Sequence, residues 1–153
     1  MAEATEPSKP YIALQVMMMP KDANGHPSFG MLPGGGQYAL YSTIFGGVLL
    51  SYIDLAGAIA AQRELQLRGG NPMAAFVTVA INRVEFKRPV LVGDVVRFET
   101  TVTRVGRTSI TVRIDVQAER GAETIHVTEA EGVFVGVDLS TPDRKPVPLF
   151  PNA

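Results

Sequence analysis

The 153-residue chain contains no cysteine, which excludes disulfides, cysteine metal ligands and a cysteine nucleophile. Basic residues are not concentrated anywhere, and 14 Lys and Arg against 15 Asp and Glu leave a net charge of -1. The absence of a basic stripe argues against nucleic-acid binding. No apolar run reaches the roughly 18 residues of a membrane span, and the acidic N-terminus does not resemble a secretory signal. We therefore expect a soluble, cytoplasmic protein with no nucleic-acid or membrane partner.

The length and the 46% hydrophobic content favour one domain over residues 1–153. We expect a flexible tail at 1–10 and a short strand at 12–18. Residues 20–43 are rich in glycine and proline and predict an irregular loop, of a length that is usually functional or disordered. Four prolines after residue 138 predict an extended tail over 138–153.

Residues 47–67 form the best helix candidate. Its first turns are apolar nearly all round, which predicts a buried helix. Gly69, Gly70 and Pro72 supply the glycine and proline signals that end a helix.

The following residues change to the two-residue period of strands. We expect strands at 76–86, 95–105, 108–119 and 124–137, with Val96, Phe98, Thr100, Val102 and Arg104 on one face of the second. Tight turns between them imply an antiparallel sheet, which the helix of about 30 Å would cover. The fold class is therefore α+β, with one central helix wrapped by a curved sheet. Its apolar surface exceeds what one such layer pair hides, so we expect a homo-oligomer.

Asp54 is the anomaly of the predicted helix, because nearly every neighbour in residues 49–60 is apolar. A lone buried carboxylate costs several kcal/mol unless it is paired, protonated or hydrated. Asp54 is therefore a candidate catalytic group. The alternative is that Asp54 is an N-cap and the helix begins after it.

Gly46 and Gly47 precede the helical run. A helix N-terminus offers free N–H groups and a positive dipole end, which can hold the oxyanion of an attacked carbonyl. The alternative is a junction that needs glycine for its dihedral angles. Asp54 follows Gly47 by seven residues, or about 10 Å of helix. One helix cannot place both groups on one carbonyl carbon, so we expect one of them to come from a second protomer.

Other catalytic patterns are weak or absent. His26 in the glycine-proline loop and His126 in a strand make a poor metal site, and no metal is expected. The sequence has no G-x-S-x-G motif, and Gly34-Gly35-Gly36 lacks the Lys-Ser/Thr of a P-loop.

Three motifs in order resemble those of the YciA-like acyl-CoA thioesterases of the hotdog superfamily. They are Phe45-Gly46-Gly47 followed by Asp54-Leu55-Ala56-Gly57-Ala58, the segment from Phe86 to Asp94, and Gly106-Arg107-Thr108-Ser109. The resemblance covers about Ile12 to Pro148.

This resemblance implies a hotdog fold and hydrolysis of an acyl-CoA to coenzyme A and an acid, with no cofactor beyond the substrate's own coenzyme A. It implies that Asp54 is general base or nucleophile, and that the Phe45-Gly46-Gly47 turn gives the oxyanion hole through Gly47, with Val48 as a further donor. It also implies coenzyme A contacts from Arg88, Gly106, Arg107, Thr108 and Ser109, and dimers that commonly assemble into hexamers. Arg88 and Arg107 suit phosphate groups, or are ordinary solvated charges.

One departure separates the chain from that family, which usually carries Asn-x-x-Gly a few residues before Phe-Gly-Gly. Asn24 lies far upstream here, residues 26–43 form an insertion, and Tyr41, Ser42 and Thr43 occupy the place of the polar residues. A non-catalytic acyl-CoA binding module therefore remains an alternative. An enoyl-CoA hydratase or dehydratase is a weaker one, because the predicted helix contains no histidine.

Overall fold

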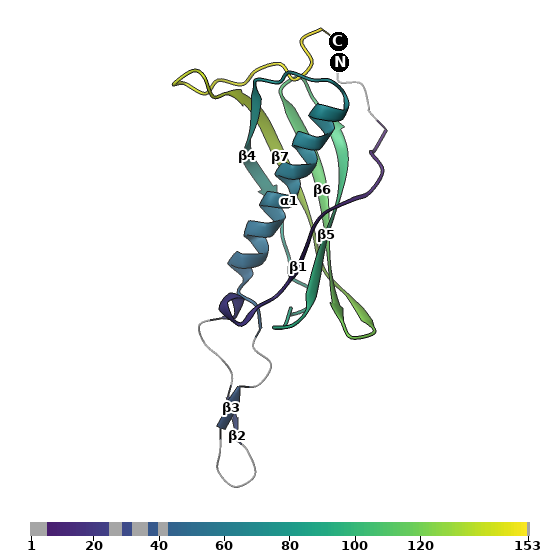
Figure 1. The fold of residues 1–153 in the computed structure, drawn as a ribbon, viewed down its shortest axis with the longest axis vertical. Coiled ribbons are helices and arrows are strands. Elements are labelled where there is room, and N and C mark those ends of the chain that lie inside the picture. Colours follow the sequence, from purple (N-terminus) through teal and green to yellow (C-terminus); the bar gives the residue numbers. More distant parts are fainter. Residues whose placement is uncertain (1–5, 25–28, 32–36, 40–42, 153) are drawn as a thin grey trace.

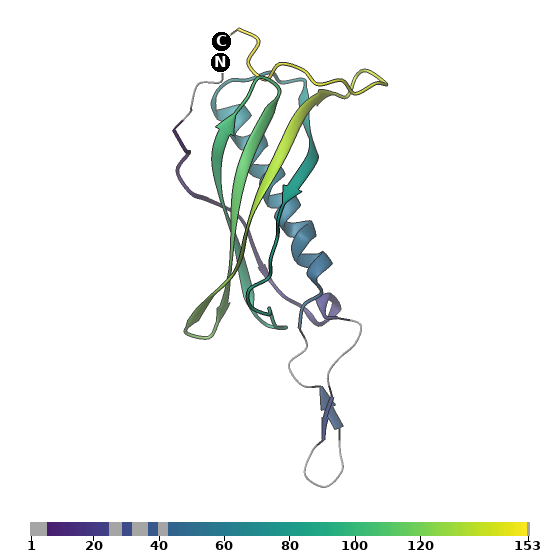
Figure 2. The ribbon, with the colours of Figure 1, turned by 180° about the vertical axis from the view of Figure 1, so that it is seen from behind.

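The computed structural model describes residues 6–24, 29–31, 37–39 and 43–152. Its centre is a five-stranded sheet in the order β1-β5-β6-β7-β4, and every neighbouring pair is antiparallel. The strands are β1 (Tyr11–Met17), β4 (Ala74–Asn82), β5 (Val95–Val105), β6 (Ser109–Arg120) and β7 (Glu123–Asp138). The helix α1 (Gly46–Leu67) lies along one face of this sheet (Figures 1 and 2). The predicted α+β architecture is confirmed.

The core forms where the inward faces of β5 and β6 meet α1. Strand alternation places Val96, Phe98 and Thr100 of β5 on the buried face. Val102 continues this face, but the register with β6 shifts between Val102 and Arg104. Arg104 is exposed, so it does not share the buried face of the other four residues as the sequence predicts, because the bulge interrupts the alternation.

The helix α1 begins one residue earlier than predicted and ends at Leu67 as predicted. Its buried side is lined by small and branched residues, including Ile53, Ala56 and Ala60. The expectation that its first turns are buried all round is wrong for the single chain. Leu50 and Leu55 are 38% and 47% exposed, so α1 has an apolar face that neither the sheet nor the rest of the described chain covers.

The segment before α1 contains more regular structure than the sequence predicts. A short 3-10 helix, η1, spans Pro20–Asp22, and β2 (Phe29–Met31) pairs antiparallel with β3 (Gln37–Ala39). That segment is rich in glycine and proline, so no hydrophobic period predicts these elements. The strand β4 ends at Asn82, four residues before the predicted end at 86. Arg83 has a φ of 33°, in the left-handed region, and this turns the chain out of the sheet.

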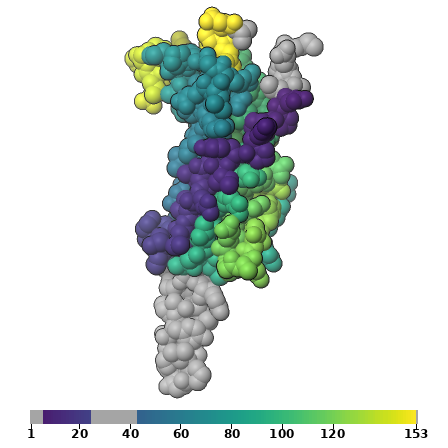
Figure 3. Space-filling view, turned by 45° about the vertical axis from the view of Figure 1, so that its right-hand side comes forward, coloured from purple at the N-terminus to yellow at the C-terminus, as the bar shows by residue number. Residues whose placement is uncertain are grey.

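Both described terminal segments are attached to the body. Ser8 exchanges hydrogen bonds with the backbone of Val102 in β5, although the sequence places it in a flexible tail. Leu149 is fully buried, and its N–H donates to the Arg107 carbonyl. Figure 3 shows the N-terminal segment running along the outside of the body. Among the described residues, no helix is long and apolar enough to cross a membrane.

Candidate active site

Asp54 lies within α1, which begins eight residues earlier at Gly46, so the N-cap alternative is wrong. The N-cap is Phe45, whose side chain makes no capping hydrogen bond. The Asp54 carboxylate is partly buried, and its Oδ1 accepts a hydrogen bond from the Thr78 hydroxyl of β4. Thr78 is the only hydrogen-bond donor to this carboxylate among the described residues, so Oδ2 remains available to a water molecule or a substrate.

The N-terminus of α1 presents the backbone groups that the sequence singles out. The N–H of Val48 donates to the Phe45 carbonyl at 3.0 Å, so that donor is already occupied. Within the described part of the chain, the N–H groups of Gly46 and Gly47 have no such partner. Among the described residues, Gly46 and Gly47 are therefore the donors left to hold an anion at the positive end of the helix.

Two hydrogen bonds fix where α1 begins. The Phe45 N–H donates to the Asp22 carbonyl at 3.0 Å, and the Ile44 N–H donates to the Val90 carbonyl at 2.8 Å. The Asp22 carboxylate in turn accepts the N–H of Met19 at 2.9 Å. These hydrogen bonds hold in place the residues that precede Gly46 and Gly47, and so fix the direction of their N–H groups.

A cavity of about 360 Å³ opens beside this helix terminus. Its walls come from the start of α1 and from the segment after β4, and include Thr43, Ile44, Gly46, Leu49, Phe86, Lys87, Arg88, Pro89 and Val90. Arg88, which the family resemblance assigns to coenzyme A, is therefore at this end of the helix.

The segment that carries Arg88 is held by a buried ion pair. Asp94 is 2% exposed, and its carboxylate receives Nε and Nη2 of Arg120 at 3.0 and 2.8 Å and the N–H of Leu91 at 2.9 Å. Arg120 also donates to the Pro89 carbonyl at 3.2 Å. The hydrogen bonds that Arg120 donates to Asp94 raise the pKa of its guanidinium above the usual range. Asp94 therefore shapes the wall of the cavity.

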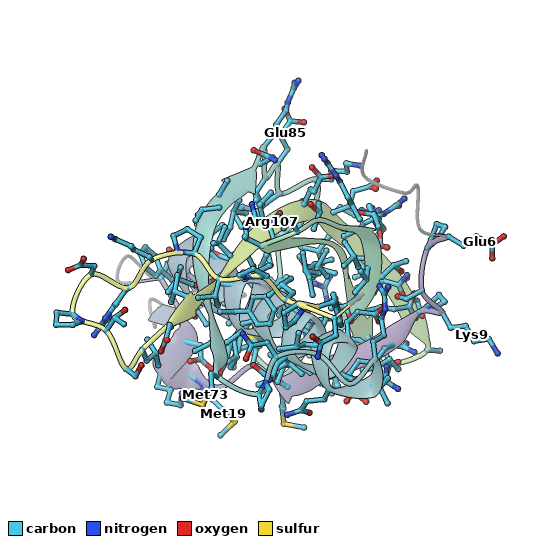
Figure 4. The ribbon with its side chains drawn as sticks, turned by 90° about the horizontal axis from the view of Figure 1, so that it is seen from above. Glu6, Lys9, Met19, Met73, Glu85 and Arg107 are labelled. Carbon is cyan, nitrogen blue, oxygen red and sulfur yellow. The ribbon has the colours of Figure 1, made fainter. Side chains whose placement is uncertain are left out.

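The turn of Gly106, Arg107, Thr108 and Ser109 lies at the opposite end of the molecule. This turn joins β5 to β6, and the Gly136 N–H of β7 donates to the Thr108 carbonyl. The C-terminal segment lies beside it, because the Leu149 N–H donates to the Arg107 carbonyl at 2.9 Å. Figure 4 looks down on this end and labels Arg107. Because α1 spans 22 residues, or about 33 Å, one chain does not bring this turn and Arg88 together.

Two polar residues lie near these groups although the sequence places Asn24 far upstream and gives no signal for Thr78. Asn24 lies beside Thr43, because its Nδ2 donates to Thr43 Oγ1 at 2.7 Å and its N–H donates to the Thr43 carbonyl at 2.9 Å. Asn24 is therefore a neighbour of the helix terminus despite its distance along the chain. Thr78 gave no sequence signal, since it reads as one β-branched residue in a strand.

The remaining candidates lie elsewhere. His126 is a partly buried residue of β7, and His26, Tyr41 and Ser42 lie outside the described residues. No group of three or more potential metal ligands occurs among the residues that the structure describes.

An exposed apolar face surrounds Asp54. On α1 it is formed by Leu50 and Leu55, which are 38% and 47% exposed. The neighbouring strand β4, which carries Thr78, also exposes Val77 and Val79. The strand β4 is also an edge of the sheet, so one side of its backbone has no neighbouring strand among the described residues.

Comparison with known proteins gives consistent matches over nearly the whole chain. The acyl-CoA thioester hydrolase YciA of Salmonella typhimurium is 34% identical over 143 residues, covering 90% of this chain and 89% of the relative. The solved structure of Cj0915, a hexameric hotdog fold thioesterase of Campylobacter jejuni, has a TM-score of 0.67 and 38% identity, covering 90% of this chain and 89% of that one.

A second structure, of HI0827, is that of a hexameric broad specificity acyl-coenzyme A thioesterase in an aspartate-to-alanine mutant form. It has a TM-score of 0.71 and 27% identity, covering 94% of this chain and 89% of that one. The family profile described as Thioesterase superfamily matches residues 41–125. With α1 packed on a five-stranded antiparallel sheet, this chain belongs to the thioesterase superfamily and has the hotdog fold.

Proposed function

We propose that this protein hydrolyses acyl-CoA thioesters to free coenzyme A and a carboxylic acid. The observation that carries the proposal is Asp54, a half-buried carboxylate in the middle of an apolar helix with one oxygen bonded to Thr78. The relatives' names support the substrate class, because the Salmonella protein is an acyl-CoA thioester hydrolase. No cofactor beyond the coenzyme A of the substrate is required.

In the proposed reaction, Asp54 removes a proton from a water molecule as the water oxygen attacks the thioester carbonyl carbon. The tetrahedral intermediate collapses with cleavage of the C–S bond, and the proton passes to the departing thiolate of coenzyme A. Alternatively, the carboxylate attacks the carbonyl carbon directly, the C–S bond breaks and coenzyme A leaves as the thiolate. Water then hydrolyses the mixed anhydride, which releases the acid, restores the carboxylate and provides the proton that the thiolate takes up. Both routes need an ionised Asp54 with a free oxygen, which the single bond from Thr78 leaves.

The oxyanion of the intermediate is held at the N-terminus of α1. Gly47 is the main donor in this proposal, and the free N–H of Gly46 is a second one. Val48 contributes to the shape of the turn, since its own N–H is bonded to the Phe45 carbonyl. Removing one oxyanion-hole donor from an enzyme typically costs about 10²–10³ in kcat.

The complete site is shared between protomers of a homo-oligomer. Gly47 and Asp54 are separated by about 10 Å along one helix, and the exposed apolar face around Asp54 is available to a second copy. Two similar solved thioesterases are hexameric. We propose a dimer as the unit that completes the site, with a trimer of dimers as the larger assembly.

Coenzyme A would then contact both subunits. Arg88 lies beside one helix terminus, and the turn of Gly106, Arg107, Thr108 and Ser109 is supplied by the other protomer. The guanidinium groups suit the phosphates of the nucleotide.

The test is release of free thiol from a panel of acyl-CoA esters, comparing the wild type with Asp54→Asn. We expect turnover by the wild type and a loss of roughly 10²–10⁴ in kcat for the variant, because the base is removed with its shape retained. Asp143→Asn, at an exposed aspartate of the C-terminal segment, is the matched control and should keep full activity.

Full turnover by a folded Asp54→Asn protein would refute the assignment. A wild type that binds acyl-CoA esters and hydrolyses none would instead support the binding module. Water addition to an enoyl-CoA would favour the hydratase.

A further inference from the structure

The cavity at the N-terminus of α1 has one apolar, closed side and one open side. Ile44, Leu49 and Val90 are 6%, 3% and 2% exposed, so they form its floor. Phe86 is 40% exposed and stands at the mouth, with its ring 3.4 Å from the position that a Cβ on Gly46 would take. The free N–H groups of the helix terminus therefore border the mouth of an apolar pocket.

Thr43, Lys87 and Arg88 supply polar groups to the lining, but the floor distinguishes between the two halves of an acyl-CoA. The pantetheine arm carries two amides, and burying an amide without hydrogen bonds costs roughly 2–7 kcal/mol in transfer experiments. The floor offers only alkyl side chains, and the backbone groups of Ile44 N–H and Val90 C=O are already bonded to each other at 2.8 Å. An alkyl chain loses nothing there and gains from leaving water.

The floor has little freedom to move away from a longer chain. The bond between Ile44 and Val90 continues as a bridge between Thr43 and Leu91, so two segments close the floor as a short ladder. Leu49 lies one helical turn after Gly46 and thus on the same side of α1. Its side chain is the part of the floor directly below the mouth.

We propose that this cavity is the acyl pocket, that it accepts straight acyl chains of up to about twelve carbons, and that Leu49 sets the limit. This rests on the proposed thioesterase function. The length is an order-of-magnitude figure from the volume of about 360 Å³, because a water molecule, which is similar in size to a methylene group, takes up roughly 30 Å³. The pocket is thus suited to short and medium chains, and longer chains would have to leave carbon atoms in water.

The experiment measures kcat/KM for straight-chain acyl-CoA esters from two to eighteen carbons, with the wild type, Leu49→Ala and Leu65→Ala. Leu65 is the matched control, because it is 1% exposed on the same helix but at the end remote from the cavity. We expect the wild-type kcat/KM to fall beyond about twelve carbons. Leu49→Ala should move this fall to chains about three carbons longer, because the substitution removes three carbon atoms from the floor. Leu65→Ala should leave its position unchanged.

Leu49→Val, which removes only one methylene, covers the case in which Leu49→Ala does not fold, and its expected shift is about one carbon. A non-hydrolysable series of alkyl-CoA thioethers provides an independent measurement by calorimetry. Affinity for the wild type should rise roughly three- to fourfold per methylene and level off near twelve carbons.

Two results would overturn the acyl-pocket assignment while leaving the hydrolase intact. One is a chain-length profile that the Leu49 variants do not change, and the other is a thioether affinity that still rises beyond sixteen carbons. Absence of turnover on every ester would instead defeat the proposed function. In that case the affinities of the thioether series alone test whether the cavity binds the acyl chain.

Discussion

The bond between Thr78 and Asp54 joins a helix to the edge strand of the sheet at the centre of the proposed chemistry. A carboxylate in an apolar helix has several rotamers, and a hydroxyl donor on one oxygen selects one of them. Thr78 precedes a register shift between Thr78 and Ala80, where β4 bulges. Bulges re-aim side chains, and here the strand irregularity lies next to the residue that holds Asp54.

We expect Thr78→Val to lower kcat by about tenfold with little change in KM, because a hydrogen bond to a charged group is lost and the shape is kept. Thr78→Ser should restore most of the rate, since it returns the hydroxyl. Thr124→Val, at an exposed strand threonine of β7, is the control. Steady-state kinetics decide the matter, and unchanged kcat in Thr78→Val would show that this bond has no positioning role.

The connection between β4 and β5 depends on the buried pair of Asp94 and Arg120. Removal of Arg120 would leave a carboxylate that is 2% exposed with only the Leu91 N–H as partner. We expect Arg120→Ala to lower the free energy of unfolding by about 2–3 kcal/mol, since buried charges are costly to leave unpaired. Arg113→Ala is the comparison, because Arg113 forms ion pairs on the exposed face of the sheet that contribute about 0–1 kcal/mol.

Chemical denaturation of the two variants measures both effects, and equal losses would contradict the distinction. Arg120 also donates a hydrogen bond to the Pro89 carbonyl in the cavity wall. Arg120→Ala should therefore lower kcat even under conditions in which the variant is fully folded.

The stability of the short helix η1, whose Asp22 carbonyl accepts the Phe45 N–H at the start of α1, depends on pH. The hydrogen bond from the Met19 N–H, together with the neighbouring Lys21 ammonium, lowers the pKa of Asp22 below its usual value. The unfolded chain therefore binds a proton more readily than the folded one, and stability rises with pH across this window. The contribution is complete above the unfolded pKa of about 3.9 and is lost as the pH falls through the lower folded value.

We expect Asp22→Asn to be less stable than the wild type at pH 7 and to approach it below about pH 3. Thermal unfolding curves recorded from pH 7 to pH 2.5 test this. A gap between the two proteins that stays constant over the whole range would contradict the assignment.

The elements that the sequence predicts well are those whose period is uninterrupted. β5 matches its predicted bounds, and α1 differs by one residue, because a two-residue or 3.6-residue repeat is written in the local sequence. Contacts between distant residues are not written in that way. Thr78 meets Asp54 across 24 residues and Asn24 meets Thr43 across 19, and only the folded topology brings them together.

The sequence predicts a surplus of apolar surface, but it does not predict which side of α1 is exposed, and the reason is a different one. Side chains that bury against a partner chain have the same composition as those that bury in a core, so Leu50 and Leu55 read as core residues. A hydrophobic pattern states that a side chain is apolar, and it does not state which molecule covers it.

In the whole molecule, the apolar surface of α1 that stays exposed lies next to the proposed base, Asp54. We expect Leu55→Asp to reduce the assembly to smaller species, because burial of the new charge against a partner is unfavourable. Turnover should fall with the loss of assembly, although Leu55 belongs to no proposed chemical step. Light scattering coupled to size exclusion measures the mass. Leu139→Asp, which changes a leucine that is 57% exposed on the C-terminal segment, should leave both properties intact.

The division of the site between protomers can be tested directly by mixing two inactive variants. Asp54→Asn lacks the base, and Gly47→Val obstructs the donors, because a Cβ on Gly47 would lie 2.5 Å from the Phe45 ring. If Gly47 of one subunit acts with Asp54 of the other, a mixed dimer contains one intact site and one doubly defective site. Co-refolded mixtures should then recover about a quarter of the wild-type activity, since about half of the dimers are mixed. If both groups acted from the same chain, every site in the mixture would carry one defect, and the activity would stay at the level of the separate variants.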